Sequence, residues 1–200
     1  MKVTKAQAAE NREGIVDAAA RLYREKGLDG VGIAEITRDA GLTHGGLYRH
    51  FDSKEALARE ACLRAFEWTI TPLEGLDSTE SSEAAGADAK LHAMVRSYLS
   101  VDHRDHPGEG CPAAALATDA ARAGPEMSEV FALGVERNIE RFMKVVPGDD
   151  DAGRRARSIV TLSSMVGALV LARATAAGDS ALSEEILATL CRELASSGLG

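Results

Sequence analysis

Residues 43 to 54 contain a cluster of polar side chains that can bind phosphate groups and the edges of DNA bases. On a helical wheel turning about 100° per residue, Leu47 and Phe51 share one apolar face. The exposed side carries three side chains with hydrogen-bonding groups: Tyr48, Arg49 and His50. Because hydroxyl, guanidinium and imidazole groups bind phosphate oxygens and base edges, the pattern predicts a helix that packs inward through its apolar face and presents the other to nucleic acid.

Two short helices around a tight turn at residues 41–43 would position these side chains. We expect the first helix at residues 33–40, with Gly41 ending it. Thr43 caps the second, which ends near Phe51, and His44 lies in its first turn, where recognition helices commonly meet base edges. The arrangement predicts a helix-turn-helix whose second helix can lie in a DNA major groove. An ordinary helical hairpin in an all-α core is the alternative.

Two adjacent glycines, Gly45 and Gly46, open this second helix. Each is unfavourable in a helix interior by about 1 kcal/mol. Two explanations stay open: either the backbone approaches a nucleic acid closely at these positions, or the first turn of the helix simply tolerates glycine.

The composition favours a soluble, helical protein of 200 residues, long enough for one compact domain or for a small module plus a larger one. Aromatic residues make up only 4%, while alanine and leucine are abundant, which favours helices over sheets. The first residues lack the apolar run of a secretory signal, and three scattered cysteines do not make a disulfide scaffold. The most apolar stretch, residues 158–172, is too short and too polar for a membrane span. We therefore expect a cytoplasmic protein that does not bind a membrane.

The formal net charge of −8 is unevenly distributed along the chain. Residues 1–56 hold nine Lys or Arg and nine Asp or Glu, so the excess of acidic residues lies after them. An acidic protein is a poor non-specific DNA binder. DNA binding would therefore depend on local contacts and not on a broad positive field.

Periodicity and capping residues predict about nine helices and no strand, which makes the fold class all-α. The first helix covers residues 5–26, with Thr4 in a capping box and Gly27 as the stop. A longer helix opens at Asp52, in a capping pattern with Glu55, and runs through Trp68.

The second half of the chain also contains residues that are expected to begin or end helices. Residues 102–110 are expected to form a polar loop, after which Cys111-Pro112 starts a helix with proline at its favoured first position. Apolar residues between 153 and 177 spread over more than one face, which predicts a helix buried on several sides. Ser183 is expected to cap the final helix.

Residues 15–57 resemble the N-terminal domain of the TetR family of transcriptional regulators. The resemblance rests on Gly41-Leu42-Thr43, on Leu47-Tyr48-Arg49-His50-Phe51 and on Lys54, and it covers about a fifth of the chain. It implies a three-helix helix-turn-helix DNA-binding domain at residues 1–54 and a helical effector-binding and dimerisation domain at residues 55–200. It also implies a homodimer that binds a palindromic double-stranded DNA operator, usually as a repressor.

The resemblance also implies roles for single residues. The family's phosphate contacts fall on four positions: Thr43, Tyr48, His50 and Lys54. Its base contacts fall on His44, Gly45 and Gly46, and the helical wheel adds Arg49. The chain departs from the family at Gly32, where Ser or Thr usually caps the second helix, so a phosphate contact from that side chain is absent.

The family's C-terminal domain dimerises through its last two helices and encloses a small-molecule effector. We therefore expect residues 153–177 and the final helix to form the homodimer contact, with closure of a monomer core as the alternative. The expected effector-binding residues are apolar or soft, which suits a hydrophobic or aromatic ligand: Trp68, Met94, Tyr98, Cys111 and Phe131. Simple core packing is the alternative for each of them.

Cys111 has a second possible role because it precedes Pro112 at the start of a helix. The helix dipole and free N–H groups there favour a thiolate. The stretch HPGEGCPAAALA resembles a branch of TetR-type regulators with a cysteine before the sixth helix, which can sense electrophiles or oxidants. An inert capping cysteine is the alternative.

Residues 102–111 are also compatible with two other classes of function. An enzyme could pair Cys111 with His103 or His106 as a nucleophile and base, and a helical adaptor would need no site at all. The histidines, acidic residues and cysteine of residues 102–111 are of metal-ligand types, but no second ligand cluster is visible, so we expect no metal and no cofactor.

Overall fold

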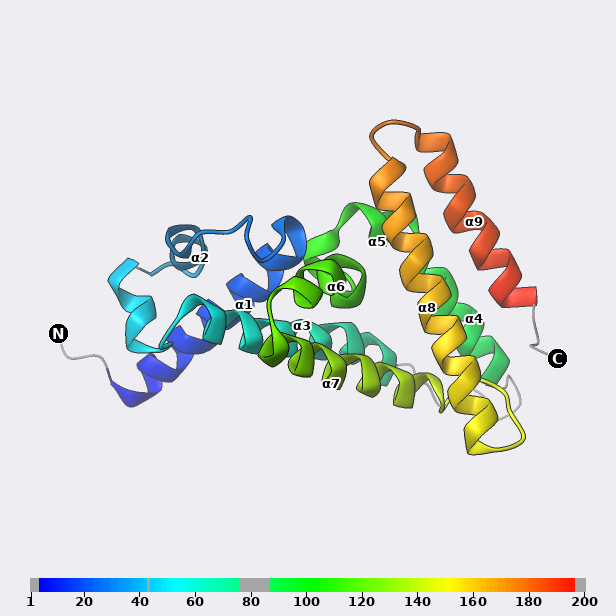
Figure 1. The fold of residues 1–200 in the computed structure, drawn as a ribbon, viewed down its shortest axis with the longest axis horizontal. Helices are drawn as coiled ribbons and strands as arrows, with labels where there is room; N and C mark the ends of the chain where they lie inside the picture. Colours follow the sequence, from blue (N-terminus) through cyan, green and yellow to red (C-terminus); the bar gives the residue numbers. More distant parts are fainter. Residues whose placement is uncertain (1–3, 43, 76–86, 197–200) are drawn as a thin grey trace. The chain divides into compact units, whose positions relative to one another are not determined.

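The structure is a computed structural model that describes residues 4–42, 44–75 and 87–196. This part of the chain consists of nine α-helices and two 3-10 helices, with no strand (Figure 1). Their bounds are α1 Lys5–Lys26, α2 Ile33–Asp39, η1 His44–Arg49, α3 Lys54–Gly75, α4 Ala87–Tyr98, α5 Val101–Asp105, η3 Pro107–Glu109, α6 Pro112–Arg122, α7 Pro125–Phe142, α8 Asp151–Thr175 and α9 Ser180–Ser196. The all-α fold class expected from the sequence is confirmed.

The chain divides into two compact units. The first contains residues 1–69 and 107–131, and the second contains residues 70–106 and 132–200. The first unit therefore includes the whole predicted helix-turn-helix domain together with η3, α6 and the start of α7. The functional boundary at residue 54 stays a prediction.

Helix α1 begins and ends as its sequence predicts. The hydroxyl of Thr4 accepts a hydrogen bond from the Gln7 backbone N–H at 3.1 Å, which satisfies one free donor of the first turn. Gly27 ends the helix with φ of 79°, a backbone conformation that glycine adopts without a steric penalty. Between these ends, Ile15, Ala19 and Leu22 are buried on one face, as the i, i+4, i+7 spacing requires.

Helix α3 differs from its sequence prediction at both ends. Ser53, and not Asp52, caps it: the Ser53 hydroxyl accepts a hydrogen bond from the Ala56 backbone N–H at 3.1 Å, and the helix begins at Lys54. The helix continues to Gly75, past the expected end near Trp68. A capping pattern read from the sequence does not decide between adjacent polar residues, because the backbone angles of the entering chain make that choice.

The expected loop at residues 102–110 is also wrong, because this segment is folded into α5 and η3. The Ser100 hydroxyl caps α5 by accepting a hydrogen bond from the His103 backbone N–H at 3.1 Å. The helix C-terminus is stabilised by Arg173 of α8, which donates to the carbonyl oxygens of His103 and Arg104. This long-range contact explains why a polar segment with little helical signal becomes helical.

Helices α8 and α9 lie side by side in the second unit, and α4 contacts α9 (Figure 1). One face of α8 is buried through small and apolar residues that include Leu162, Met165 and Leu169. The other face is exposed, so the expected burial on several sides is wrong within the single chain. Within the described ranges, α8 is the one helix whose length and composition would allow it to cross a membrane.

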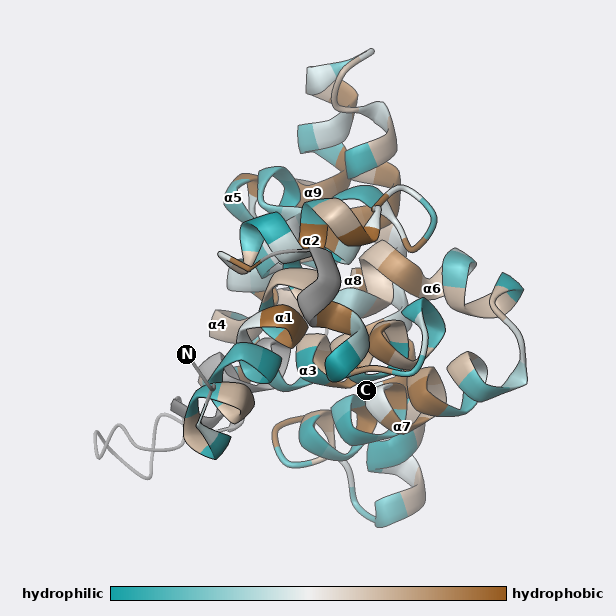
Figure 2. Cartoon of the chain, turned by 90° about the vertical axis from the view of Figure 1, so that its left-hand side faces the viewer, coloured by the Kyte–Doolittle hydropathy of each residue, from teal (hydrophilic) through white to brown (hydrophobic). Residues whose placement is uncertain are grey.

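The start of α9 corrects one further expectation. Asp179 caps this helix through a hydrogen bond from the Leu182 backbone N–H at 3.0 Å. Ser183 lies inside the helix and is buried, where its hydroxyl donates to the Ala172 carbonyl oxygen of α8 at 2.7 Å. Most helices here, such as α7, carry hydrophilic and hydrophobic residues together, as expected for packing through one face (Figure 2).

Candidate nucleic-acid interface

The segment after the turn presents the polar side chains that the helical wheel predicts. Leu47 is completely buried and Phe51 nearly so, which seats the segment in the first unit. Tyr48 is 58% exposed and Arg49 is also exposed, while His50 is half-buried. The orientation inferred from the sequence is therefore confirmed for these five residues. Their contact with DNA stays a prediction.

The segment is a 3-10 helix, η1, and not the expected α-helix. Its end is fixed by two hydrogen bonds to one acceptor: the backbone N–H groups of His50 and Phe51 donate to the Leu47 carbonyl oxygen at 2.8 and 3.0 Å. Two successive glycines near its start are consistent with the tighter form, because glycine weakens the α-helix and 3-10 turns are short. In this form Leu47 and Phe51 are both buried.

The start of the predicted interface lies outside the part described in detail. Thr43 is not among the described residues, and neither the side chain of His44 nor the exposure of Gly45 and Gly46 is described. The turn before them is described: Gly41 has φ of 69°, and the Leu42 backbone N–H donates to the Thr37 carbonyl oxygen at 2.7 Å. The backbone therefore reverses direction where the sequence places the turn.

Lys54 stands at the first position of α3, five residues after Arg49, and is half-buried. Beside it, Glu55 accepts hydrogen bonds from its own backbone N–H and from Ser53, which together lower the pKa of its carboxyl group below the usual value. A carboxylate at a helix N-terminus is favoured by the helix dipole. The N-terminus of α3 therefore stabilises the negative charge of Glu55, and Lys54 carries the positive charge at this position.

These observations agree with the comparison to known proteins. Residues 15–61 match the sequence pattern of the family described as bacterial regulatory proteins, tetR family. The match includes α2, η1 and the beginning of α3, which are the elements that form the candidate interface.

Residues 15–61 of the chain belong to the TetR family.

Relatives support this membership over part of the chain. The transcriptional repressor KstR2 of Mycolicibacterium smegmatis is 28% identical over 102 residues, which cover 50% of this chain and 48% of the relative. The chain spans about half the length of the curated relatives it matches, or less.

Solved structures extend the likeness to the whole fold. A TetR-family regulator from Cytophaga hutchinsonii has a TM-score of 0.75 at 18% identity and covers 100% of both chains. The reduced form of NemR from Escherichia coli has a TM-score of 0.74 at 19% identity and covers 92% of this chain and 94% of NemR. At this identity the likeness establishes the fold of the second unit and nothing about its ligand.

The five expected effector-binding residues are distributed over both units of the chain. Met94 is buried and Tyr98 half-buried on α4 of the second unit, whereas Cys111 and Phe131 belong to the first. The ring of Phe131 packs edge-on against Phe66 with centroids 5.4 Å apart. The side chain of Trp68 lies outside the described residues.

Cys111 stands at the N-cap position of α6, as the sequence predicts, and is completely buried. Its neighbour Gly110 accepts a hydrogen bond from Arg24 of α1 at 2.8 Å. Leu28, just after α1, donates its backbone N–H to Asp119 of α6 at 3.1 Å. The start and the body of α6 are therefore fixed to the end of α1 within the first unit.

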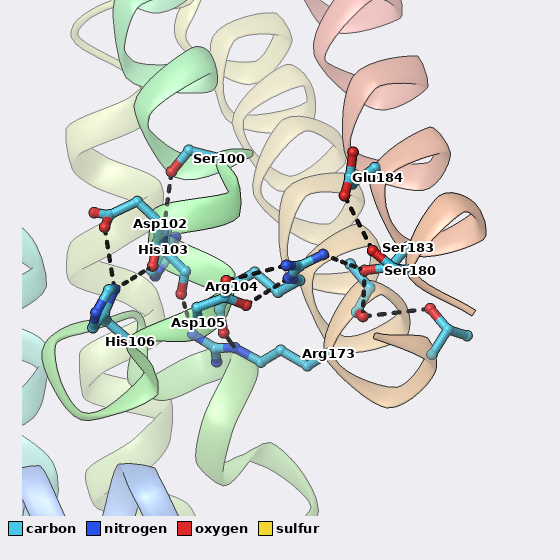
Figure 3. Close-up of polar contacts among 12 residues, drawn as sticks. Ser100, Asp102, His103, Arg104, Asp105, His106, Arg173, Ser180, Ser183 and Glu184 are labelled. Carbon is cyan, nitrogen blue, oxygen red and sulfur yellow. Dashed lines mark hydrogen bonds and ion pairs between the residues drawn. The ribbon is translucent and has the colours of Figure 1, made fainter. Parts of the chain in front are cut away.

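The two histidines that precede Cys111 in the sequence have structural partners in the second unit (Figure 3). His103 Nδ1 lies 2.7 Å from the Tyr98 carbonyl oxygen and its ring packs edge-on against that of Tyr98, while His106 Nδ1 lies 2.8 Å from the Asp102 carbonyl oxygen. No group of three or more His, Cys, Asp or Glu in the described ranges is placed to hold a metal ion. These side chains stabilise the short helix α5.

Two arginines join α5 to the last two helices, as Figure 3 shows. Arg104 points toward α9 and donates to the Ser183 hydroxyl at 3.0 Å, and it also forms a pair of hydrogen bonds with Asp105. Arg173 reaches back from α8 to the carbonyl oxygens of α5. The sequence did not indicate either arginine, because neither belongs to a motif and their partners in other helices are 69 or more positions away.

Two buried polar atoms in the second unit were also missed. Asn138 on α7 and Thr161 on α8 are almost completely buried, yet Asn138 Oδ1 and Thr161 Oγ1 have no hydrogen-bond partner among the described residues. Buried polar groups are normally hydrogen-bonded, so each is a candidate for a ligand contact. The sequence signal would have been a polar residue on the apolar face of its helix.

Proposed function

We propose that this TetR-family protein is a transcriptional repressor that binds a palindromic DNA operator as a homodimer and is released by an effector. The observation that carries the proposal is the seating of η1: Leu47 and Phe51 are buried, while Tyr48 and Arg49 face outward. The hydroxyl of Tyr48 and the guanidinium of Arg49 are therefore accessible to a ligand outside the protein. They are suited to phosphate and base contacts.

The proposed contacts follow the roles that the family implies for these positions. Tyr48, His50 and Lys54, together with Thr43, bind phosphates and set the position of the protein on the duplex. The first turn, at His44, Gly45 and Gly46, reads base edges, with Arg49 as an additional contact. The name of KstR2, a repressor, favours repression over activation for this chain.

The homodimer is proposed to form through α8 and α9. The outward face of α8 carries exposed apolar residues separated by small ones: Ile159, Val160, Ser163, Gly167, Val170 and Leu171. Val160 is 53% exposed and Leu171 57%. A continuous apolar face of this kind is typical of a subunit interface, and small residues allow two helices to approach closely. A second copy of this chain would cover it.

The effector is proposed to be a small hydrophobic or aromatic molecule with a hydrogen-bonding group, or an electrophile or oxidant that reacts with Cys111. Met94 and Tyr98 supply apolar and aromatic surface in the second unit. Asn138 Oδ1 and Thr161 Oγ1 would be satisfied by a hydroxyl or amide of the ligand. The fully buried Cys111 reacts only after local opening of the first unit.

The deciding experiment is a binding assay of the purified chain with the intergenic DNA beside its own gene. Fluorescence anisotropy is measured with labelled duplex, with and without candidate compounds and mild oxidants. We expect saturable binding of two chains per duplex that competitor DNA of random sequence does not displace. An affinity for this duplex equal to that for random DNA would contradict the proposal.

An enzymatic function finds no support among the relatives, which include repressors of transcription such as KstR2. The described residues place His103 and His106 against backbone carbonyl oxygens of α4 and α5, where they have a structural role. The DNA-binding function is therefore the one that the site supports best. We also propose that the protein acts in the cytoplasm, where the operator is accessible.

A further inference from the structure

Arg12 of α1 lies over the ring of Phe51, with its guanidinium carbon 4.7 Å from the ring centroid. Phe51 stands between the end of η1 and the start of α3, and its ring is almost completely buried. A guanidinium at this distance is attracted to the face of an aromatic ring. Arg12 therefore covers the residue that joins the two elements of the candidate DNA interface.

The same guanidinium is held in place by a carboxylate of α3. Arg12 Nη2 donates to both carboxylate oxygens of Glu60, at 2.5 and 2.6 Å. Glu60 is six residues after Lys54 on the same helix, less than two turns away. Arg12 consequently makes contact with the ring before α3 and with the body of α3 at once.

A second bridge joins α1 and α3 without touching the interface. Arg64 of α3 forms ion pairs with Glu13 and with Asp17 of α1, the latter at 2.9 Å. Glu13 and Glu60 are both partly exposed carboxylates paired with an arginine across the same two helices. The difference between the two bridges is the aromatic ring, which only the Arg12 bridge includes.

We propose that Arg12, oriented by Glu60, is a positioning residue for DNA binding. It fixes Phe51, and with it the junction between η1 and α3, in the conformation that presents Tyr48 and Lys54 to a duplex. The inference rests on the proposed DNA-binding function. Arg12 has this role without binding a phosphate itself, since its guanidinium is engaged by Glu60 and by the ring.

Electrostatics and positioning predict opposite changes in DNA affinity for one of the variants. Glu60→Gln and Glu13→Gln each remove one negative charge from the seam between α1 and α3, and electrostatics alone would strengthen DNA binding in both variants. If Arg12 positions Phe51, Glu60→Gln should instead weaken DNA binding, whereas Glu13→Gln should not. Arg12→Lys keeps the charge but loses the planar group that stacks on a ring, so it separates stacking from charge.

The test uses the full chain and a duplex enriched from a random-sequence pool by the wild-type protein. We expect Glu60→Gln and Arg12→Lys to weaken binding by roughly threefold to tenfold, with the salt dependence of affinity unchanged. We expect Glu13→Gln to remain within about twofold of the wild type. Thermal melts confirm that each variant is folded at the assay temperature. Arg12→Lys keeps the charge at this position and is the substitution expected to disturb the fold least.

Hydrogen exchange of the backbone N–H groups tests the positioning of Phe51 by Arg12 in the absence of DNA. The backbone N–H groups of His50 and Phe51, which donate to the Leu47 carbonyl oxygen, should exchange faster in Glu60→Gln and Arg12→Lys but not in Glu13→Gln. Unchanged exchange at these two amides overturns the inference. So does stronger DNA binding by Glu60→Gln than by the wild-type chain. A wild-type chain that enriches no duplex contradicts the proposed function alone, because hydrogen exchange still decides the role of Arg12.

Discussion

Arg24 of α1 donates a hydrogen bond from Nη1 to the carbonyl oxygen of Gly110, 2.8 Å away and 86 positions later in the chain. Its Nε also donates to the Ala20 carbonyl oxygen at 2.9 Å, and the side chain is buried. Gly110 immediately precedes Cys111, the N-cap of α6. The helix that supports the DNA interface therefore holds the backbone at the start of α6, where the sequence places a possible sensor.

Replacement of Arg24 by methionine tests this connection. We expect Arg24→Met to lower the free energy of unfolding by about 1–3 kcal/mol, because a buried carbonyl oxygen loses its charged donor. Thermal and urea unfolding measure the change. Arg122→Met, which removes an exposed arginine from the end of α6, is the control and should change stability by less than about 0.5 kcal/mol. Equal effects of the two substitutions would show that the Arg24 contact contributes little.

Substitutions in the interface should separate phosphate contacts from base contacts. Tyr48→Phe and Lys54→Ala are expected to weaken binding to operator and random duplexes by the same factor, about threefold to tenfold, because phosphates are identical in both. His44→Ala should instead change the preference for one base pair, at a cost of about 1–3 kcal/mol on the operator only. Anisotropy titrations on both duplexes measure these changes. Equal losses on both duplexes for His44→Ala would remove it from the base contacts.

A charge on the exposed face of α8 should dissociate the homodimer. Leu171→Glu places a carboxylate, twice by symmetry, in the proposed apolar contact, and we expect the dissociation constant of the dimer to rise by about 100-fold or more. Leu133→Glu on α7 is the matched control, since Leu133 is 56% exposed and Leu171 57%. Sedimentation velocity over a concentration series gives both constants. A dimer weakened equally by both substitutions, or by neither, would place the contact elsewhere.

The three cysteines should react with a thiol reagent in the order of their exposure. Cys191 is half-exposed, whereas Cys62 and Cys111 are buried, and burial raises the pKa of Cys62 to about 12, so its thiolate is scarce at pH 8. We expect Cys191 to be labelled first, and the two buried thiols at least about tenfold more slowly, since they require local opening. Intact mass and peptide mapping follow the labelling, with Cys191→Ser as the control. Faster labelling of Cys111 than of Cys191 would reveal a path to its sulfur and favour the sensor.

The sequence by itself determined the class of the fold and the orientation of the interface. The 3.6-residue periodicity placed Leu47 and Phe51 inward and Tyr48 outward, and the cap at Thr4 and the stop at Gly27 bounded α1. These features depend on residues within about four positions of each other, so local chemistry is sufficient to determine them. The local sequence did not determine the 3-10 form of η1, because glycine permits more than one backbone conformation.

Only the tertiary structure decided which distant groups meet. Ser183 could cap a helix by its sequence, yet it is buried because α8 offers the Ala172 carbonyl oxygen and Arg104 offers a donor. Residues 102–110 are too polar to predict a helix, but Arg173 satisfies the carbonyl oxygens that end α5. The stacking of Arg12 on Phe51 likewise joins residues 39 positions apart. Such pairs form only when the helices pack, so no local pattern in the sequence can predict them.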